Sequence, residues 1–100
     1  MNVLLADDEP QVRFALRVLL RQQPGIETLG EAADSEGLLS KAGPSCPDLV
    51  LLDWELPDRA AADVVFALRK QCPEARIIAL SSRPEARRAA LSAGVDTFVS

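Results

Sequence analysis

Short runs of hydrophobic residues alternate along the chain with longer segments in which hydrophobic residues recur every three or four positions. The short runs are typical of strands buried on both faces of a sheet, and the longer segments are typical of amphipathic helices. The segment 26–32 sets Ile26, Thr28 and Gly30 against charged neighbours, which predicts a weaker strand at the edge of a sheet. The expected strands cover residues 3–6, 26–32, 49–52, 76–82 and 95–100.

Proline, glycine and capping residues mark the ends of four expected helices. Proline is favoured in the first turn of a helix, serine and aspartate cap its amino end, and glycine often follows its carboxyl end. The four helices are expected to begin at Pro10, at Ser35 as a cap, at Asp58 as a cap and at Pro84. They are expected to end before Pro24, at Gly43, at Cys72 and at Gly94.

The regular alternation of strand and helix predicts a parallel sheet. Crossover connections between parallel strands are right-handed, and a strand with continuous hydrophobic sequence needs helices on both faces of its sheet. We therefore expect a doubly wound α/β domain with three layers, α/β/α, that occupies residues 1–100 as a single unit.

Composition narrows the class of protein. Hydrophobic residues make up 48% of the chain and charged residues 26%, which is typical of a folded domain with a real core. The formal net charge of −4 argues against this segment clamping nucleic acid by itself, because neutralising phosphates needs a basic face. No signal peptide and no segment long enough to span a membrane is expected.

The two cysteines are expected to be reduced thiols in a cytoplasmic protein. Cys46 and Cys72 each precede a proline, and neither belongs to a C-x-x-C motif. Because the chain also has no histidine, a zinc site of the usual kind is not expected.

Acidic and hydroxyl residues follow three of the expected core strands directly. They are Asp7, Asp8 and Glu9 after the first, Asp53 after the third, and Ser81 and Ser82 after the fourth. The carboxyl ends of parallel strands meet at one edge of the sheet, where ligands of such folds bind. Clustered carboxylates either hold a proton or bind a cation, and a set of oxygen ligands without histidine favours Mg²⁺.

A cation at this edge would allow one carboxylate to act as a nucleophile towards a phosphoryl group and form an acyl phosphate. A nearby serine could then donate a hydrogen bond to a phosphoryl oxygen. Each residue alone also has a purely structural interpretation. Asp7 to Glu9 suit the amino end of a helix, Asp53 suits a turn before Pro57, and Ser81 suits a helix cap.

Four segments carry a resemblance to a known family. They are VLLADDEP, DLVLLDWELPD, RIIALSS and AGVDTFVS, and they resemble the landmarks of the receiver domain of bacterial two-component response regulators. The chain is most similar to the subclass that carries a LuxR-like (NarL-like) helix-turn-helix output domain. The resemblance covers all 100 residues and implies a flavodoxin-like, five-stranded parallel sheet of order 2-1-3-4-5.

The resemblance implies a role for each acid. Asp53 corresponds to the phosphoacceptor, which receives a phosphoryl group from a sensor histidine kinase. Asp8 corresponds to a direct Mg²⁺ ligand and Asp7 to the acid that helps to hold the ion, partly through water. The backbone carbonyl of Glu55 would be a further Mg²⁺ ligand.

The resemblance also identifies a switch pair. Ser81 corresponds to the switch hydroxyl, and Phe98 to the aromatic residue whose side-chain rotamer follows it. Transcription regulation through DNA would then require an output domain, which this segment does not contain.

The sequence departs from the family pattern in three ways. Ala61 stands where a glycine is usual, so the loop must be built without a backbone position at positive φ, and Phe98 replaces the commoner tyrosine. The position of the family's phosphate-binding lysine falls directly after Ser100, and the fifth helix is missing. We therefore expect a fragment, or the ordered part, of a longer protein, with an apolar face that promotes homodimerisation or other self-association.

Two other functions are consistent with parts of the pattern. A pseudo-receiver would keep the fold as a protein-interaction module without phosphorylation. A phosphatase of the haloacid dehalogenase type would place its nucleophile after the first strand in a D-x-D motif, whereas this chain has DDEP there. The favoured hypothesis is a signalling domain and not an enzyme.

Overall fold

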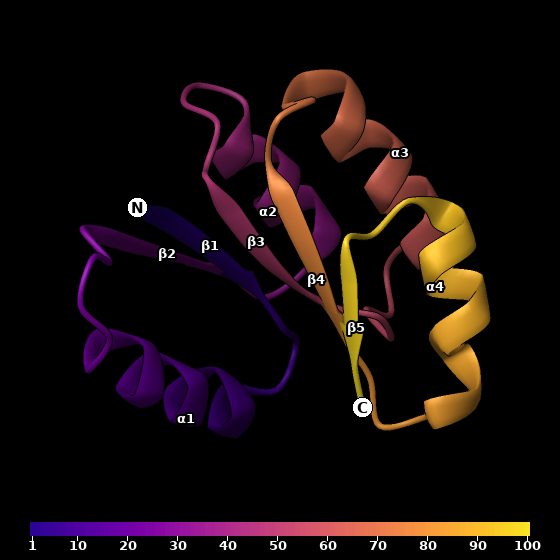
Figure 1. Cartoon of the computed structure of the whole chain (residues 1–100), viewed down its shortest axis with the longest axis horizontal. Coiled ribbons are helices and arrows are strands. Elements are labelled where there is room, and N and C mark those ends of the chain that lie inside the picture. Colours follow the sequence, from indigo (N-terminus) through magenta and orange to yellow (C-terminus); the bar gives the residue numbers. More distant parts are fainter.

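The computed structural model describes residues 1–100 and contains one five-stranded parallel sheet flanked by helices (Figure 1). The strands are β1 (Asn2–Ala6), β2 (Thr28–Ala32), β3 (Leu49–Asp53), β4 (Arg76–Leu80) and β5 (Thr97–Val99). The helices are α1 (Pro10–Arg21), α2 (Ser35–Ala42), α3 (Ala61–Gln71) and α4 (Arg87–Ala93), with a 3₁₀ turn, η1 (Pro84–Ala86), before α4. The strand order β2-β1-β3-β4-β5 confirms the predicted fold.

The register of the central strands brings the acids together. Ala6 at the end of β1 pairs with Leu52 of β3, so Asp7 and Asp53 are the next residues on neighbouring strands. Asp53 itself pairs with Leu80 of β4, and Ser81 follows Leu80 directly. The carboxyl ends of all three strands therefore lie along one rim of the sheet, which we call the carboxyl rim; the opposite edge is the amino rim.

The two faces of the sheet are covered unequally. One face packs against α2, α3 and α4 around a core of 19 buried residues, in which Leu38, Leu52 and Leu68 are completely buried. The other face packs only against α1, and its buried cluster consists of Val3, Leu5 and Leu51. No residue of α1 is buried.

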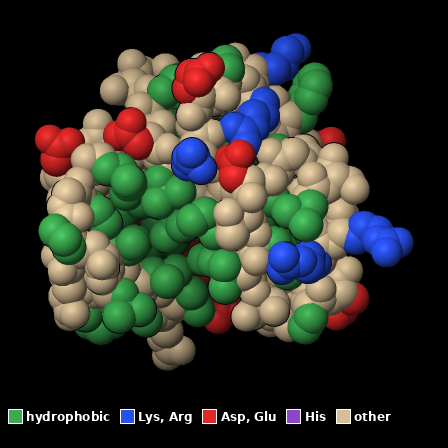
Figure 2. Space-filling view, viewed as in Figure 1, with side chains coloured by type: hydrophobic (Ala, Val, Ile, Leu, Met, Phe, Trp, Pro, Cys, Tyr) green, Lys and Arg blue, Asp and Glu red, His purple; other side chains and the backbone are tan.

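Hydrophobic side chains gather on the less covered face, between α1 and β5 (Figure 2). Leu16, Leu20, Ile78 and Leu80 are partly buried against the small cluster there. Leu19 of α1 is 57% exposed. The self-association expected from such a face stays a prediction.

No helix has the length and apolar character needed to cross a membrane.

Two helix caps differ from the prediction. Asp34, and not Ser35, is the N-cap of α2, and its carboxylate accepts a hydrogen bond from the Gly37 N–H at 2.7 Å. Asp58 does not cap α3, whose N-cap residue is Ala60. The Asp58 carboxylate instead accepts hydrogen bonds from the Ser35 hydroxyl at 2.6 Å and from the Ser35 N–H at 3.1 Å.

The loop that connects β3 to α3 is thus joined to the start of α2 through Asp58. These contacts, led by the Ser35 hydroxyl, lower the pKa of the Asp58 carboxyl below its ordinary value.

No residue other than glycine has positive φ, so this loop is built without such a position, as expected from Ala61. Gly94, with φ of 109°, ends α4 in the left-handed conformation that glycine adopts without strain.

The cysteines form a disulfide between Cys46 and Cys72, so the prediction of two reduced thiols was wrong. Their separation of 26 residues gave no sign of pairing, because spacing along the chain says little about two loops on neighbouring elements. Cys46 lies in the connection from α2 to β3 and Cys72 at the end of α3. The fold brings their Cα atoms to 5.5 Å, which is within the usual range for a disulfide.

Candidate functional site

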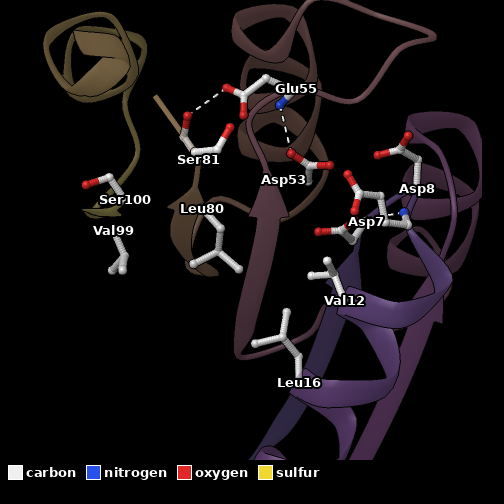
Figure 3. A pocket seen from close by; sticks show the side chains of 12 residues that line it. Asp7, Asp8, Val12, Leu16, Asp53, Glu55, Leu80, Ser81, Val99 and Ser100 are labelled. Carbon is white, nitrogen blue, oxygen red and sulfur yellow. Dashed lines mark hydrogen bonds between the residues drawn. The ribbon is translucent and has the colours of Figure 1, made fainter. Parts of the chain in front are cut away.

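Three carboxylates converge at the carboxyl rim. Asp7, Asp8 and Asp53 each offer one oxygen, and these oxygens all lie within 4.8 Å of one another. Asp7 is buried, Asp53 is partly buried and Asp8 is exposed. The convergence of these acids, on which the sequence-based hypothesis depends, is thus present in the structure (Figure 3).

Two of these carboxylates are oriented by the same type of local turn, each in its own loop. Asp7 Oδ1 accepts a hydrogen bond from the Glu9 N–H at 2.9 Å, and Asp53 Oδ1 accepts one from the Glu55 N–H at 2.9 Å. Aspartate commonly bonds to the backbone two residues later in this way. The second carboxylate oxygen of each residue receives no backbone hydrogen bond, which leaves it for another ligand.

Burial and mutual repulsion raise the pKa of both inner acids. Desolvation is the largest cause for Asp53, and hydrogen bonding by Asp8 and the charges of Asp7 and Asp8 add to it, so its pKa rises to about 7. Desolvation also raises the pKa of Asp7 above its ordinary value, assisted by the charge of Asp8 and opposed by the Glu9 N–H and by Arg13. The site therefore holds more negative charge than the protein neutralises.

Arg13 bonds the backbone of Asp7 and not its carboxylate. Arg13 Nη1 donates its hydrogen bond to the backbone carbonyl of Asp7 at 2.6 Å, and its Nε lies 3.7 Å from Glu31. Three convergent carboxylates offer only oxygen donors, and burial and repulsion raise the pKa of Asp7 and Asp53. This arrangement matches the chemistry of a hard divalent cation. The residues present therefore fit Mg²⁺.

A cleft of about 500 Å³ opens over the acids, between α1 and the ends of β4 and β5. The three acids lie at one end, Val12 and Leu16 of α1 form one wall, and Ser100 is on the far side (Figure 3). The cleft is open to solvent and large enough to admit a phosphoryl group beside Asp53.

The two serines after β4 have different surroundings. Ser81 is partly buried and lines the cleft, and its hydroxyl donates a hydrogen bond to Glu55 Oε2 at 2.7 Å (Figure 3). Ser82 is exposed. Neither serine caps the following helix, because the residues before η1 and α4 are Arg83 and Ala86.

Phe98 does not line the cleft. Its side chain is 5% exposed and belongs to the main core, beneath α4. The guanidinium of Arg87 lies 6.0 Å from the centre of its ring. Phe98 pairs in register with Ala79, two residues before Ser81, so it is close to the candidate switch hydroxyl along the sheet but faces the opposite side from α1.

Sequence reasoning missed the side chains of Glu55 and Arg83. Glu55 was expected to contribute only a backbone carbonyl, yet its carboxylate bonds Ser81 and lies 3.5 Å from Arg83 Nη2. The two residues follow β3 and β4, so a search of both strand ends for opposite charges could have found the pair.

Comparison with known proteins identifies the family. Residues 3–100 match the model of the response regulator receiver domain. The nitrate/nitrite response regulator protein NarL of Escherichia coli K12 is 31% identical over 98% of this chain and 46% of its own length. The chain spans about half the length of the curated relatives it matches.

Solved structures agree in fold, and one of them belongs to the LuxR family. The response regulator TrrA of Thermotoga maritima, in complex with Mg²⁺ and BeF, is 32% identical, with a TM-score of 0.86 over 98% of this chain and 84% of that one. A LuxR-family two-component response regulator from Aurantimonas is 28% identical, with a TM-score of 0.87 over 97% of this chain and 71% of that one. The chain therefore belongs to the family of response regulator receiver domains and resembles those of LuxR-type regulators.

Proposed function

We propose that the chain is a signalling domain that accepts a phosphoryl group on Asp53 with the help of Mg²⁺. The observation that carries the proposal is the meeting of Asp7, Asp8 and Asp53 within 4.8 Å at the carboxyl rim, in a cleft open to solvent. The likeness to TrrA, whose structure was solved with Mg²⁺ and BeF, supports it.

Asp7, Asp8, Asp53 and the backbone carbonyl of Glu55 would hold the Mg²⁺. When bound, the cation screens the carboxylates and draws negative charge from the phosphoryl oxygens, which allows an anionic nucleophile to approach. The Glu55 N–H, 2.9 Å from Asp53 Oδ1, fixes the orientation of the nucleophile and leaves Oδ2 to react.

The donor would be the phosphohistidine of a sensor histidine kinase. Asp53 Oδ2 attacks the phosphorus, the O–P bond forms as the P–N bond breaks, and the imidazole nitrogen keeps the electron pair. The domain takes part in this transfer as a substrate of the kinase and not as an enzyme with substrates of its own. This chemistry is consistent with a cytoplasmic protein.

The phosphorylated domain would act on an output that lies outside these residues. A net charge of −4 does not favour DNA binding by the domain itself, so transcription regulation requires a further DNA-binding segment. The likeness to NarL and to a LuxR-family regulator supports an output of this kind.

Incubation with acetyl phosphate and Mg²⁺, followed by intact-mass measurement, tests the proposal. We expect an adduct of one phosphoryl group per chain, lost in Asp53→Asn and after removal of Mg²⁺ by EDTA. Asp63→Asn is the matched control, because Asp63 is an exposed acid in the first turn of α3, away from the cleft. Absence of an adduct would instead indicate a pseudo-receiver, and repeated turnover of phosphoesters would indicate a hydrolase.

A further inference from the structure

The hydroxyl of Ser81 already has partners within the protein. Its single hydrogen is donated to Glu55 Oε2 at 2.7 Å, and its oxygen accepts a hydrogen bond from the Arg83 N–H at 2.9 Å. A longer contact of 3.3 Å joins the hydroxyl to the Arg83 carbonyl. Because a hydroxyl has only one hydrogen to donate, Ser81 cannot bond Glu55 and a phosphoryl oxygen on Asp53 at the same time.

Glu55 lies between the candidate nucleophile and the candidate switch hydroxyl. Its N–H donates to Asp53 Oδ1, while its carboxylate accepts from Ser81 on the other side (Figure 3). The carboxylate is held by Arg83, whose Nη2 lies 3.5 Å from the same oxygen, Oε2. A short chain of contacts thus joins the loop after β3 to the loop after β4.

We propose that the Glu55 side chain is a positioning residue that holds Ser81 away from the phosphoryl site until the phosphoryl group displaces it. This inference rests on the proposed function and adds a residue that regulates the same site. The Glu55–Ser81 hydrogen bond is an inhibitory contact, and phosphorylation becomes a competition between a carboxylate and a phosphoryl group for one hydroxyl hydrogen. Both acceptors are charged, so both form strong hydrogen bonds with the hydroxyl.

The exposure of the contact makes exchange possible. The Glu55 side chain is 31% exposed and that of Arg83 is 55% exposed, so Glu55 can be hydrated by water as soon as Ser81 leaves it. Breaking a contact of this kind therefore does not leave a buried acceptor without a partner, which is the costly case. The Glu55–Ser81 contact opposes the switch without preventing it.

Binding of beryllium fluoride, a stable mimic of the phosphoryl group, measures the competition directly. Calorimetric titration in Mg²⁺ gives the dissociation constant for the unmodified chain and for Glu55→Ala, Ser81→Ala and the double variant. We expect Glu55→Ala to tighten binding about fivefold when Ser81 is present, which corresponds to about 1 kcal/mol. In the Ser81→Ala background the same change is expected to tighten binding by no more than about twofold, which is the effect of removing one exposed charge.

Two further variants separate the hydrogen bond from the charge. Glu55→Gln keeps an oxygen that can accept from Ser81 but removes the charge, so its affinity is expected to remain within about twofold of the unmodified chain. Glu9→Ala removes an exposed acid that lines the same cleft and whose side chain makes no hydrogen bond, and it reports the charge effect alone. Circular dichroism of each variant verifies that the fold is intact.

Each outcome has a definite consequence. An equal gain from Glu55→Ala with and without Ser81, or an equal gain in Glu9→Ala, would overturn the inhibitory contact and leave the proposed function standing. Failure of the unmodified chain to bind beryllium fluoride, together with failure to form an adduct from acetyl phosphate, would overturn the proposed function and the inhibitory contact with it.

Discussion

The two rims of the sheet shift the pKa of an aspartate in opposite directions. At the amino rim, Asp96 accepts hydrogen bonds from the Ile77 N–H and from Arg69 Nη2, both at 2.8 Å. These contacts, led by the Ile77 N–H, lower the pKa of the Asp96 carboxyl. At the carboxyl rim, Asp53 faces Asp7 and Asp8, and its pKa rises to about 7.

The direction of the strands explains part of this contrast. N–H groups at the starts of strands are available to acids at the amino rim, as in the bonds from Asn2 to Asp48 and from Ile77 to Asp96. Acids at the carboxyl rim meet one another and the carbonyl ends of the strands. The amino rim therefore stabilises the fold, whereas the carboxyl rim keeps an unfavourable concentration of charge that a cation can relieve.

The disulfide belongs to the amino rim, and breaking it is expected to have the largest effect on stability. Closing a loop of 26 residues restricts the unfolded chain. Reduction, or Cys46→Ser, should lower the free energy of unfolding by about 3 kcal/mol and the melting temperature by on the order of 10 °C. Thermal unfolding followed by circular dichroism, with and without a dithiol reductant, measures the change.

The Cys46→Ser variant also tests whether the two rims act independently. The affinity for Mg²⁺, measured by calorimetry, should be unchanged in Cys46→Ser, because the disulfide and the acids lie at opposite ends of the sheet. A melting temperature that does not respond to reductant would show that the cross-link adds no stability. A tenfold loss of Mg²⁺ affinity would show that the two rims are coupled.

The pH dependence of stability should come from the carboxyl rim and have an intermediate size. An unfolded aspartate loses its proton near pH 3.8, whereas folded Asp53 keeps it to about pH 7, so the folded chain binds more protons between these values. Stability therefore falls as pH rises through this window and levels off above it. Without divalent ions, we expect a loss of about 2 kcal/mol between pH 5 and pH 8.

The composition of the chain makes this window easy to interpret. There is no histidine, and the cysteines of a disulfide do not titrate. The lowered pKa values of Asp58 and Asp96 contribute stability that is fully present above the unfolded value of 3.8 and is lost only as pH falls below it, outside this window. Urea unfolding at several pH values should show a shallower profile in Asp53→Asn, in which the raised pKa of Asp7 still contributes, and a smaller loss in the presence of Mg²⁺. A slope as steep in Asp53→Asn as in the unmodified chain would assign the effect to other groups.

Removing Arg69 should have the smallest of the three effects. Its guanidinium joins the end of α3 to the starts of β4 and β5, through the carbonyls of Ala75 and Gly94 and the carboxylate of Asp96. Arg69→Ala is expected to reduce the free energy of unfolding by about 1–2 kcal/mol, because several charge-assisted hydrogen bonds are lost. The control, Arg88→Ala, removes an exposed arginine of α4 and should change stability by less than about 0.5 kcal/mol. Equal losses in both variants would contradict a specific role for Arg69.

The sequence was sufficient to predict the order of the elements and the meeting of the acids. Both depend on regular properties of a parallel sheet: continuous hydrophobic strands such as Leu49–Asp53, helices between them, and carboxyl ends on one edge. Once that arrangement is expected, Asp7 and Asp53 must be neighbours whatever the details of the loops. The register of Ala6 with Leu52 agrees with this reasoning.

Contacts between loops could not be predicted in the same way. Asp58 has the sequence position of a cap for α3 but bonds Ser35 of α2, because the loop after β3 turns towards another helix. Cys46 and Cys72 likewise meet only because α2 and α3 lie side by side on one face. Such pairings depend on the paths of two connections at once, and local preference at either position does not contain that information.

The single tryptophan gives this molecule a built-in optical probe of its own site. Trp54 follows Asp53 directly, and its side chain packs partly against the main core. The chain has no tyrosine and one tryptophan. Emission excited near 295 nm, roughly the red edge of protein absorption, therefore comes from the indole alone, beside the candidate nucleophile. Occupancy of the acid cluster can therefore be followed by fluorescence in the unlabelled protein, without a reporter group that could disturb the cleft.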